Sequence, residues 1–357
     1  MIIINIFVFC ITLFLYLHVI FHLKTSDDLE VFEMDDPHKQ KLEEICDIRQ
    51  PTMFRMNNAE IITTTKKDYL IEHYGAFDVK IRNMSETFAD DGELYIPAPL
   101  HASNKLFTDT TNTAYLSEKN GEFLQESGVV KNMKYNDEFL RPRMVSNCSY
   151  DVMMGGCGTR TPFRYDLNYR SYFMVTQGVA KLKLSPPKSI KYLHPNYDYE
   201  NFEFSSPINP WNPQPKYSAD FNKIKCLDIV LKPQDVMFIP SYWWHSFEFG
   251  ENTSISCFYY RTYMNVVATM PYRWMYLLQI QNVTRQFVKK MDIDPAAPVV
   301  FRDDDNASTE VEDLKSTDMS LLPGINDPIP VETAQIFCSN IEGVDISDNA
   351  RSDSIMT

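Results

Sequence analysis

Two short segments of the chain carry side chains whose types suit metal chemistry. Residues 158–166 read GTRTPFRYD and place Arg164 and Asp166 two positions apart, and residues 232–245 read KPQDVMFIPSYWWH and end in His245. Side chains two apart on a strand point the same way, so Arg164 and Asp166 are expected to share one face. Carboxylates and imidazoles hold divalent transition metals. A guanidinium does not, because it stays protonated and has no lone pair to donate.

The order and spacing of these segments, with GVAKLKLSPP at 178–187 between them, resemble a known family. It is the JmjC-like, cupin-like oxygenases of the factor-inhibiting-HIF type, whose pattern is T-P-x-H-x-D, then G-x-K ending in P-P, then G-D-x-x-x-I-P-x-x-W-W-H. The resemblance covers roughly residues 40–290. It implies a mainly β fold, a double-stranded β-helix (cupin or jelly roll) with flanking helices. It also implies an Fe(II)- and 2-oxoglutarate-dependent hydroxylase in which two histidines and one carboxylate hold the iron.

Four residues match positions of functional interest in this family. The resemblance implies Asp166 as the carboxylate ligand, His245 as the distal histidine and Thr161 as a residue that helps hold 2-oxoglutarate. Trp243 is expected to line the site, although its simplest role is packing. Thr161 is equally compatible with an ordinary strand residue.

Three positions depart from the family pattern. Arg164 stands where the first histidine ligand is expected, Ala180 where the 2-oxoglutarate lysine is expected, and Cys257 where the family has an asparagine near the site. The lysines that neighbour Ala180 are expected to point to the opposite face of their strand. Because Arg164 and Asp166 should share a face, we expect a salt bridge between them in the vacant metal site.

These observations leave three hypotheses for function. The first is a non-catalytic or strongly altered member, retained as a binding or structural module, with no confident catalytic residue or cofactor. The second is an Fe(II)/2-oxoglutarate hydroxylase that uses Asp166, His245 and a third ligand, for which the histidines at 73, 101 and 194 are candidates. The third is a barrel that binds a small anionic ligand through Arg164 without iron.

The first 23 residues are almost entirely apolar, interrupted by Asn5, Thr12, His18 and His22. At 1.5 Å per residue such a run is long enough to span a bilayer. A signal peptide competes with this interpretation, but no basic residue precedes the run and no small-residue cleavage site follows it. We therefore expect a single-pass anchor at 1–24. Lysines follow the run, which favours a cytosolic barrel, while five N-x-S/T sequons favour the other side.

The remaining sequence divides by composition. Residues 25–36 are polar and acidic and are expected to form a linker, and residues 37–291 the cupin/JmjC-like domain. Residues 292–357 carry fifteen acidic against three basic residues, a net charge of -12 out of -14, and are expected to be a disordered tail. The near-neutral body shows no basic stripe, which argues against nucleic acid binding.

Within the domain, short aromatic and β-branched runs from about 150 to 265 predict an all-β region, and the Pro- and Asn-rich stretch 192–221 predicts a long loop. Residues 270–291 are expected to form a helix that offers a homodimer contact. HLKTSDDLEV at 22–31 and LEEICDIRQP at 42–51 are also similar to cupin-like proteins encoded by giant DNA viruses, which suggests a viral protein. A protein partner is compatible with the sequence, but nothing in it identifies one.

Overall fold

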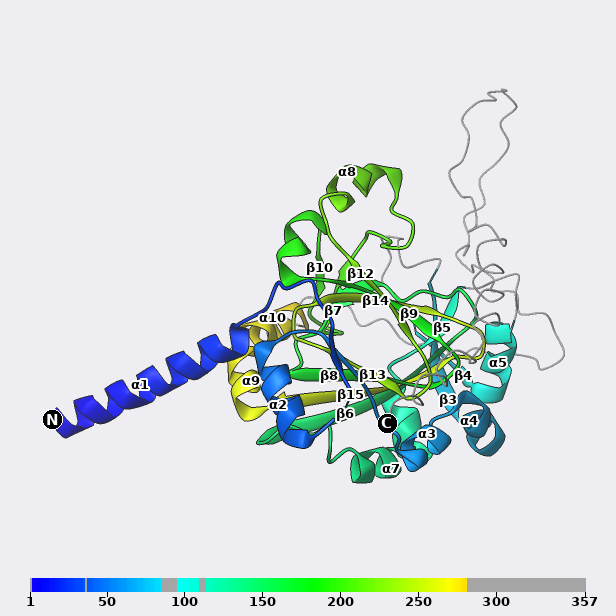
Figure 1. Cartoon of the computed structure of the whole chain (residues 1–357), viewed down its shortest axis with the longest axis horizontal. Coiled ribbons are helices and arrows are strands. Elements are labelled where there is room, and N and C mark those ends of the chain that lie inside the picture. Colours follow the sequence, from blue (N-terminus) through cyan, green and yellow to red (C-terminus); the bar gives the residue numbers. More distant parts are fainter. Residues whose placement is uncertain (1, 36, 85–94, 109–113, 281–357) are drawn as a thin grey trace, which may run out of the picture. The chain divides into compact units, whose positions relative to one another are not determined.

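Two β-sheets and a set of peripheral helices make up the protein (Figure 1). The computed structural model describes residues 2–35, 37–84, 95–108 and 114–280. The predicted tail at 292–357 and the last part of the predicted helix, 281–291, lie outside the described residues.

The larger sheet has nine strands and the smaller has six. In spatial order the larger sheet contains β1 (Phe32–Met34), β2 (Thr52–Arg55), β13 (Asp235–Ile239), β8 (Arg170–Gln177), β15 (Ser254–Thr262), β6 (Val145–Gly155), β5 (Tyr115–Ser117), β3 (Asp78–Asn83) and β4 (Ile96–Pro99). The smaller contains β10 (Asn196–Asp198), β11 (Glu203–Ser206), β7 (Phe163–Tyr165), β14 (Trp244–Phe249), β9 (Ala180–Ser185) and β12 (Leu227–Leu231). All neighbouring strands are antiparallel except β1 and β2.

The main core lies between the two sheets. It is built from alternate residues of strands from both, such as Phe173 on β8, Leu182 on β9 and Phe247 on β14. Both faces of β14 are buried, because a second, aromatic cluster covers the outer side of the smaller sheet around Phe163 and Trp244. All six residues of β14 are buried, including the polar residues His245, Ser246 and Glu248.

Helices surround the sheets (Figure 1). They are α1 (Ile2–Leu23), α2 (Lys39–Ile48), α3 (Ala59–Thr64), α4 (Lys67–Tyr74), α5 (Leu100–Thr108), α6 (Gly121–Glu126), α7 (Val129–Asn136), α8 (Ser218–Phe221), α9 (Tyr263–Ala268) and α10 (Met270–Ile280), with 3-10 turns η1 (Pro187–Tyr192) and η2 (Pro215–Tyr217). The segment before Pro51 forms α2, which ends at Ile48. Its C-cap residue, Arg49, has a left-handed backbone with a φ of 66°. The expected helix from residue 270 is confirmed over the described part as α10.

Two segments differ from the sequence-based expectation. The end of the predicted linker forms β1, which pairs with β2. The predicted loop at 192–221 contains the hairpin β10–β11, whose turn is closed by Asp198 Oδ1 accepting from the backbone N–H groups of Glu200 and Asn201. The strands have only three and four residues, and the frequent prolines and asparagines around them leave no recognisable strand pattern in the sequence. This hairpin carries Glu203 into the protein interior.

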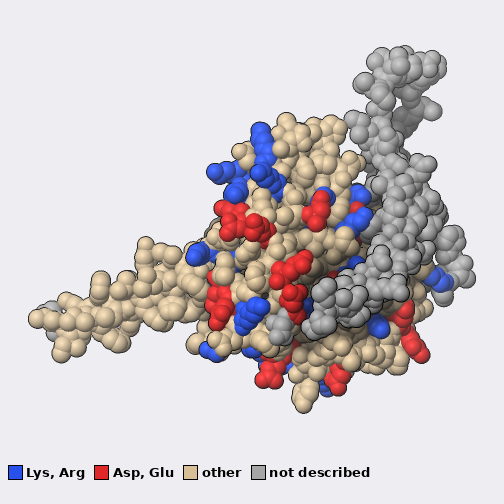
Figure 2. All heavy atoms as spheres, viewed as in Figure 1, with Lys and Arg blue, Asp and Glu red and all other residues tan. Residues whose placement is uncertain are grey.

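The N-terminal helix α1 is long and apolar enough to cross a membrane, although a signal sequence would satisfy the same criterion. Its side chains are exposed over most of its length, and Figure 2 shows a projection without charged residues. Its domain end is attached: His22 Nε2 lies 3.2 Å from Thr262 Oγ1, and the guanidinium of Arg49 lies 5.6 Å from the Phe21 ring. The described structure is therefore mainly β with flanking helices and one N-terminal apolar helix, as the sequence predicts.

Candidate functional site

Two of the residues singled out by the sequence, Arg164 on β7 and His245 on β14, meet inside the barrel. These strands are neighbours, and Arg164 is paired with His245 across them. Phe163 and Tyr165 pack in the outer aromatic cluster. Strand alternation then turns Arg164 toward the interior. Asp166 follows directly after the end of β7.

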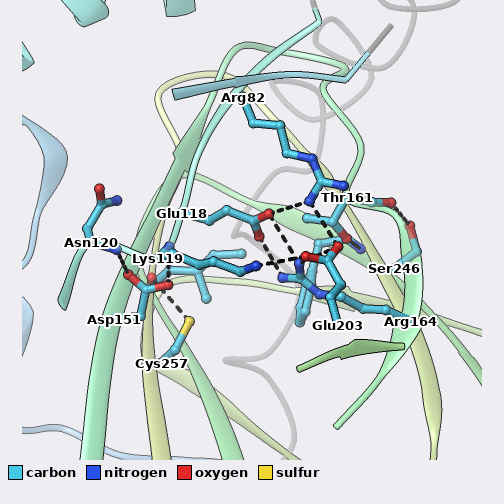
Figure 3. Close-up of polar contacts among 12 residues, drawn as sticks. Arg82, Glu118, Lys119, Asn120, Asp151, Thr161, Arg164, Glu203, Ser246 and Cys257 are labelled. Carbon is cyan, nitrogen blue, oxygen red and sulfur yellow. Dashed lines mark hydrogen bonds and ion pairs between the residues drawn. The ribbon is translucent and has the colours of Figure 1, made fainter. Parts of the chain in front are cut away.

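Arg164 forms its ion pairs with two glutamates and not with Asp166. Its Nη2 and Nη1 donate to Oε2 and Oε1 of Glu118 at 2.6 and 3.1 Å, and Nη1 lies 3.7 Å from Glu203 Oε1 (Figure 3). The two parallel bonds to Glu118 form a bidentate pair, the strongest geometry available to a guanidinium. The expected Arg164–Asp166 salt bridge was wrong, because the long Arg164 side chain reaches carboxylates that other strands bring into the interior.

A second cation binds the same two glutamates. Arg82, at the end of β3, lies 3.0 Å from Glu118 Oε1 and 2.9 Å from Glu203 Oε1 through its Nη1. Lys119 Nζ donates to Glu203 Oε2 at 2.8 Å. We call Arg82, Glu118, Lys119, Arg164 and Glu203 the buried ion cluster. It contains three cations and two carboxylates, and Arg82 and Glu118 are each only 1% exposed.

The electrostatics of the buried ion cluster follow from its pairing. Burial by itself raises the pKa of a carboxyl group, but Arg164 and Arg82 hold the pKa of Glu118 well below its usual range. Arg82 and Lys119 likewise lower the pKa of Glu203 to about 2, against the effect of burial. Burial alone lowers the pKa of Arg164, and the two glutamates outweigh it and raise that pKa well above its ordinary value. Both glutamates are therefore ionised at neutral pH.

His245 and Asp166 lie beside the buried ion cluster. His245 is 1% exposed, its Nδ1 lies 3.2 Å from the Trp243 carbonyl oxygen, and its ring packs against Phe173. Burial lowers the pKa of His245, with Asp166 acting in the opposite direction and Arg164 adding to the decrease. The imidazole is therefore neutral. Asp166 Oδ2 accepts a hydrogen bond from Ser171 Oγ at 3.3 Å.

Thr161 and Trp243 have mainly structural contacts. Thr161 Oγ1 accepts from the Phe247 backbone N–H at 2.9 Å, and its carbonyl oxygen accepts from Ser246 Oγ at 2.7 Å (Figure 3). The hydroxyl therefore joins this segment to β14. Trp243 is fully buried in the core between the sheets.

Ala180 and Cys257 are both fully buried core residues. Ala180 supplies no cation to the interior, and the lysines of β9 lie on its other face, where Lys183 pairs with Asp228. Cys257 on β15 is opposite Asp151 on β6. Asp151 accepts three backbone N–H groups, and burial raises its pKa to about 6.

The candidate third ligands lie elsewhere. His73 Nδ1 bonds the Tyr69 carbonyl oxygen, His101 Nδ1 bonds that of Gly75, and His194 Nε2 lies 3.1 Å from Asp220. Within the ranges that the structure describes, no three His, Cys, Asp or Glu residues form a group able to hold a metal ion. Asp166 and His245 can each donate a lone pair to a metal ion, whereas the guanidinium opposite His245 cannot. This donor set does not fit the two-histidine, one-carboxylate arrangement of an iron oxygenase.

A cavity of about 260 Å³ opens outside the barrel and not at this site. Its walls include Leu23 at the end of α1, Tyr242 and Trp244 near the start of β14, and Tyr272 on α10. Arg164, Asp166 and His245 do not line it.

The fold and the interior site define a cupin-type barrel, and comparison with known proteins gives the family. The Cupin-like domain model matches residues 22–265, so the chain belongs to the cupin-like domain family. The HSPB1-associated protein 1 sequences of Homo sapiens and Bos taurus are each 31% identical to this chain over 106 residues, which is 29% of this chain. The match covers only 22% of the length of those relatives. The resemblance found from the sequence is thus confirmed at the level of the family.

Sequence reasoning missed the residues that bind Arg164. Glu118 follows the three-residue strand β5, and Glu203 begins β11 inside the stretch predicted as a loop. Neither belongs to a motif. One signal was present, because a buried arginine at an inward-facing strand position requires carboxylate partners. Such partners can come from any part of the domain and need not lie two residues away.

Proposed function

We propose that this protein is a membrane-anchored cupin-like protein whose barrel is non-catalytic and serves as a binding or structural module. The observation that carries the proposal is the bidentate pair between Arg164 and Glu118, opposite His245. The family's first histidine position is thereby taken by a cation with its own buried counter-charges. A divalent ion placed there would meet a fixed positive charge and only two donors, Asp166 and His245.

The absence of a lysine at Ala180 supports the same proposal. In the related oxygenases a basic residue inside the barrel pairs with the far carboxylate of 2-oxoglutarate. Here position 180 is a fully buried methyl group that packs in the core. The two arginines of the buried ion cluster, Arg82 and Arg164, already bind Glu118 and Glu203. This pairing also weakens the case for a small anionic ligand held by Arg164.

The anchoring part of the proposal rests on α1. Its 22 residues and high apolar content suit a bilayer core, and its attachment to Thr262 and Arg49 joins it to the barrel. We propose a cytosolic barrel, because Lys24 follows α1 directly and Lys39 and Lys41 come soon after it. Expression in a cell with a glycosylating secretory pathway tests the orientation: a mass shift on glycosidase treatment, for example from the exposed sequon at Asn252, would place the barrel on the other side.

The test of the non-catalytic proposal uses the full chain in detergent or lipid. After anaerobic incubation with Fe(II) and desalting, metal analysis is expected to find iron far below one equivalent. Incubation with iron and 2-oxoglutarate in air is expected to yield no succinate above the protein-free control. Stoichiometric iron together with succinate would establish the alternative, an Fe(II)/2-oxoglutarate-dependent hydroxylase with a ligand outside the described residues.

A further inference from the structure

An exposed apolar strip follows the last two described helices, α9 and α10. It consists of Tyr263, Val267, Met270, Trp274, Met275, Leu277 and Leu278, whose side chains are between 41% and 63% exposed. Outside α1, these seven residues are more than half of the thirteen large apolar residues that are exposed in the described part of the chain. Isolated exposed apolar side chains are ordinary, but a contiguous strip of this kind marks a contact surface.

The opposite side of α10 holds the helix on the barrel. The Tyr272 ring lies 5.4 Å from the ring of Phe204, and Tyr276 is equally far from Phe202. Gln279 Oε1 accepts a hydrogen bond from the Tyr199 backbone N–H at 3.1 Å. The helix therefore presents tyrosines and a glutamine inward and large apolar side chains, including Trp274, outward. A surface helix in water has the reverse arrangement.

The apolar strip begins where α1 leaves the domain. Thr262 is the N-cap of α9, accepting from the Asn265 N–H, and its hydroxyl also lies 3.2 Å from His22 Nε2 on α1. Leu23 of α1 and Tyr272 of α10 line the same cavity. Figure 1 shows α9 and α10, in yellow, beside the domain end of α1. The strip is thus continuous with the helix that crosses the membrane in the proposed arrangement.

The charges of this region suit a phospholipid surface. Residues 263–280 contain no aspartate or glutamate, and their one charged residue is Arg273. Lys24 follows α1 directly. Tryptophan and tyrosine concentrate at the level of lipid headgroups, because their rings are apolar at one end and polar at the other. An apolar face bearing tryptophan and leucine is the part of an interfacial helix that enters the boundary between headgroups and acyl chains.

We infer that α9 and α10 lie in the interfacial layer of the membrane that α1 crosses, and that they hold the barrel against the bilayer. The inference rests on the proposed anchoring by α1. Once α1 is inserted, the strip is next to lipid without any further partner, whereas a contact with a second copy requires another molecule at the same place. The lipid surface is therefore the occupant that the position and composition of the strip favour.

Tryptophan fluorescence tests this inference on the full chain. The protein is reconstituted into phosphatidylcholine vesicles with or without bromine on the acyl chains, because bromine quenches only nearby indoles. Trp243 and Trp244 are fully buried, Trp211 is held by a hydrogen bond to Ser246, and Trp274 is 60% exposed. Brominated lipid is expected to quench the wild type. Trp274→Phe should lose most of that quenching, and the matched control Trp211→Phe should retain it.

The same vesicles separate failure of the inference from failure of the anchor. Flotation with the vesicles after alkaline carbonate treatment reports on α1. A chain that does not float overturns the anchor and the inference together. A chain that floats but whose Trp274 is unquenched by brominated lipid overturns the inference alone. If Trp274 is then quenched by aqueous acrylamide, the strip faces water, and if it is shielded from both quenchers, it faces a second copy or the chain itself.

Discussion

At the residue scale, the interior of this barrel is organised by charge pairing. Arg164 and Arg82 share Glu118 and Glu203, and Lys119 adds a third cation at the edge. Each buried charge therefore has a counter-charge within hydrogen-bonding distance. A buried pair of this kind adds little net stability over apolar residues of the same size, but removing one member leaves an uncompensated charge.

Glu118→Ala is expected to destabilise the protein by about 3–5 kcal/mol, because it leaves Arg164 and Arg82 with one shared carboxylate. Asp166→Ala should cost much less, since Asp166 does not pair with Arg164. The free energy of unfolding from denaturant titration measures both. The control is Asp228→Ala, which removes only the partly exposed pair with Lys183 and should change stability by about 1 kcal/mol or less. A larger loss for Asp166→Ala than for Glu118→Ala would contradict the observed pairing.

The buried ion cluster also predicts acid lability. Arg82 and Lys119 lower the pKa of Glu203 from 4.5 to about 2, so the unfolded chain takes up protons first as the pH falls. Stability that is fully present above about pH 4.5 should therefore be lost as the pH falls toward 2. Asp151 has the opposite effect on stability. Because its pKa is raised to about 6, its contribution becomes more favourable as the pH falls below 6. Thermal unfolding followed from pH 7 to 3 should show a shallower acid loss in Glu203→Gln than in the wild type. An equal loss of melting temperature with falling pH in the two proteins would contradict the lowered pKa of Glu203.

At the element scale, the sequence predicted what depends on local pattern. Short aromatic and β-branched runs predicted the all-β region from about 150 to 265. The alternation of side chains along a strand also correctly predicted that Arg164 faces the interior of the barrel. The partners of Arg164 were not predictable in this way, because Glu118 and Glu203 are brought together by pairings among β3, β5, β7 and β11 that leave no local signal. Strands of three or four residues, such as β5 and β11, are also too short for alternation to reveal.

The N-terminal helix can be tested without disturbing the domain. Deleting residues 2–20 keeps Phe21 and His22, which contact Arg49 and Thr262, and removes most of the apolar length. The shortened chain is expected to lose its resistance to carbonate extraction, because too few apolar residues remain to span a bilayer. Fractionation of cell lysates measures this. Full retention in the carbonate-resistant pellet would mean that α1 is not the anchor.

At the scale of the whole molecule, most of the net negative charge lies in the tail, residues 292–357, and the rest of the chain is near neutral. The composition of residues 292–357 predicts disorder, since its apolar content is low and its net charge is -12. That segment lies outside the described residues, and the prediction stands on composition alone.

Limited proteolysis is expected to trim the chain to near residue 291 and leave its melting temperature unchanged. Mass spectrometry locates the cut and calorimetry measures the melting temperature. A decrease of several degrees on trimming would show that the tail packs on the domain.

We propose that the guanidinium of Arg164 replaces a metal ligand, and the affinity of Arg164→His for Fe(II) or Mn(II) is the decisive test. The substitution leaves Arg82 and Lys119 balanced by Glu118 and Glu203, so the interior remains neutralised. It also restores an imidazole opposite His245, beside Asp166. The control Arg160→His makes the same change on the same segment, at a residue that pairs with Glu248. We expect metal affinity to rise by about tenfold or more in Arg164→His and to stay unchanged in the control, because losing even a supporting group of a metal site costs about 10–100-fold. Tight, stoichiometric metal binding by the wild type, with no gain in Arg164→His, would contradict the account.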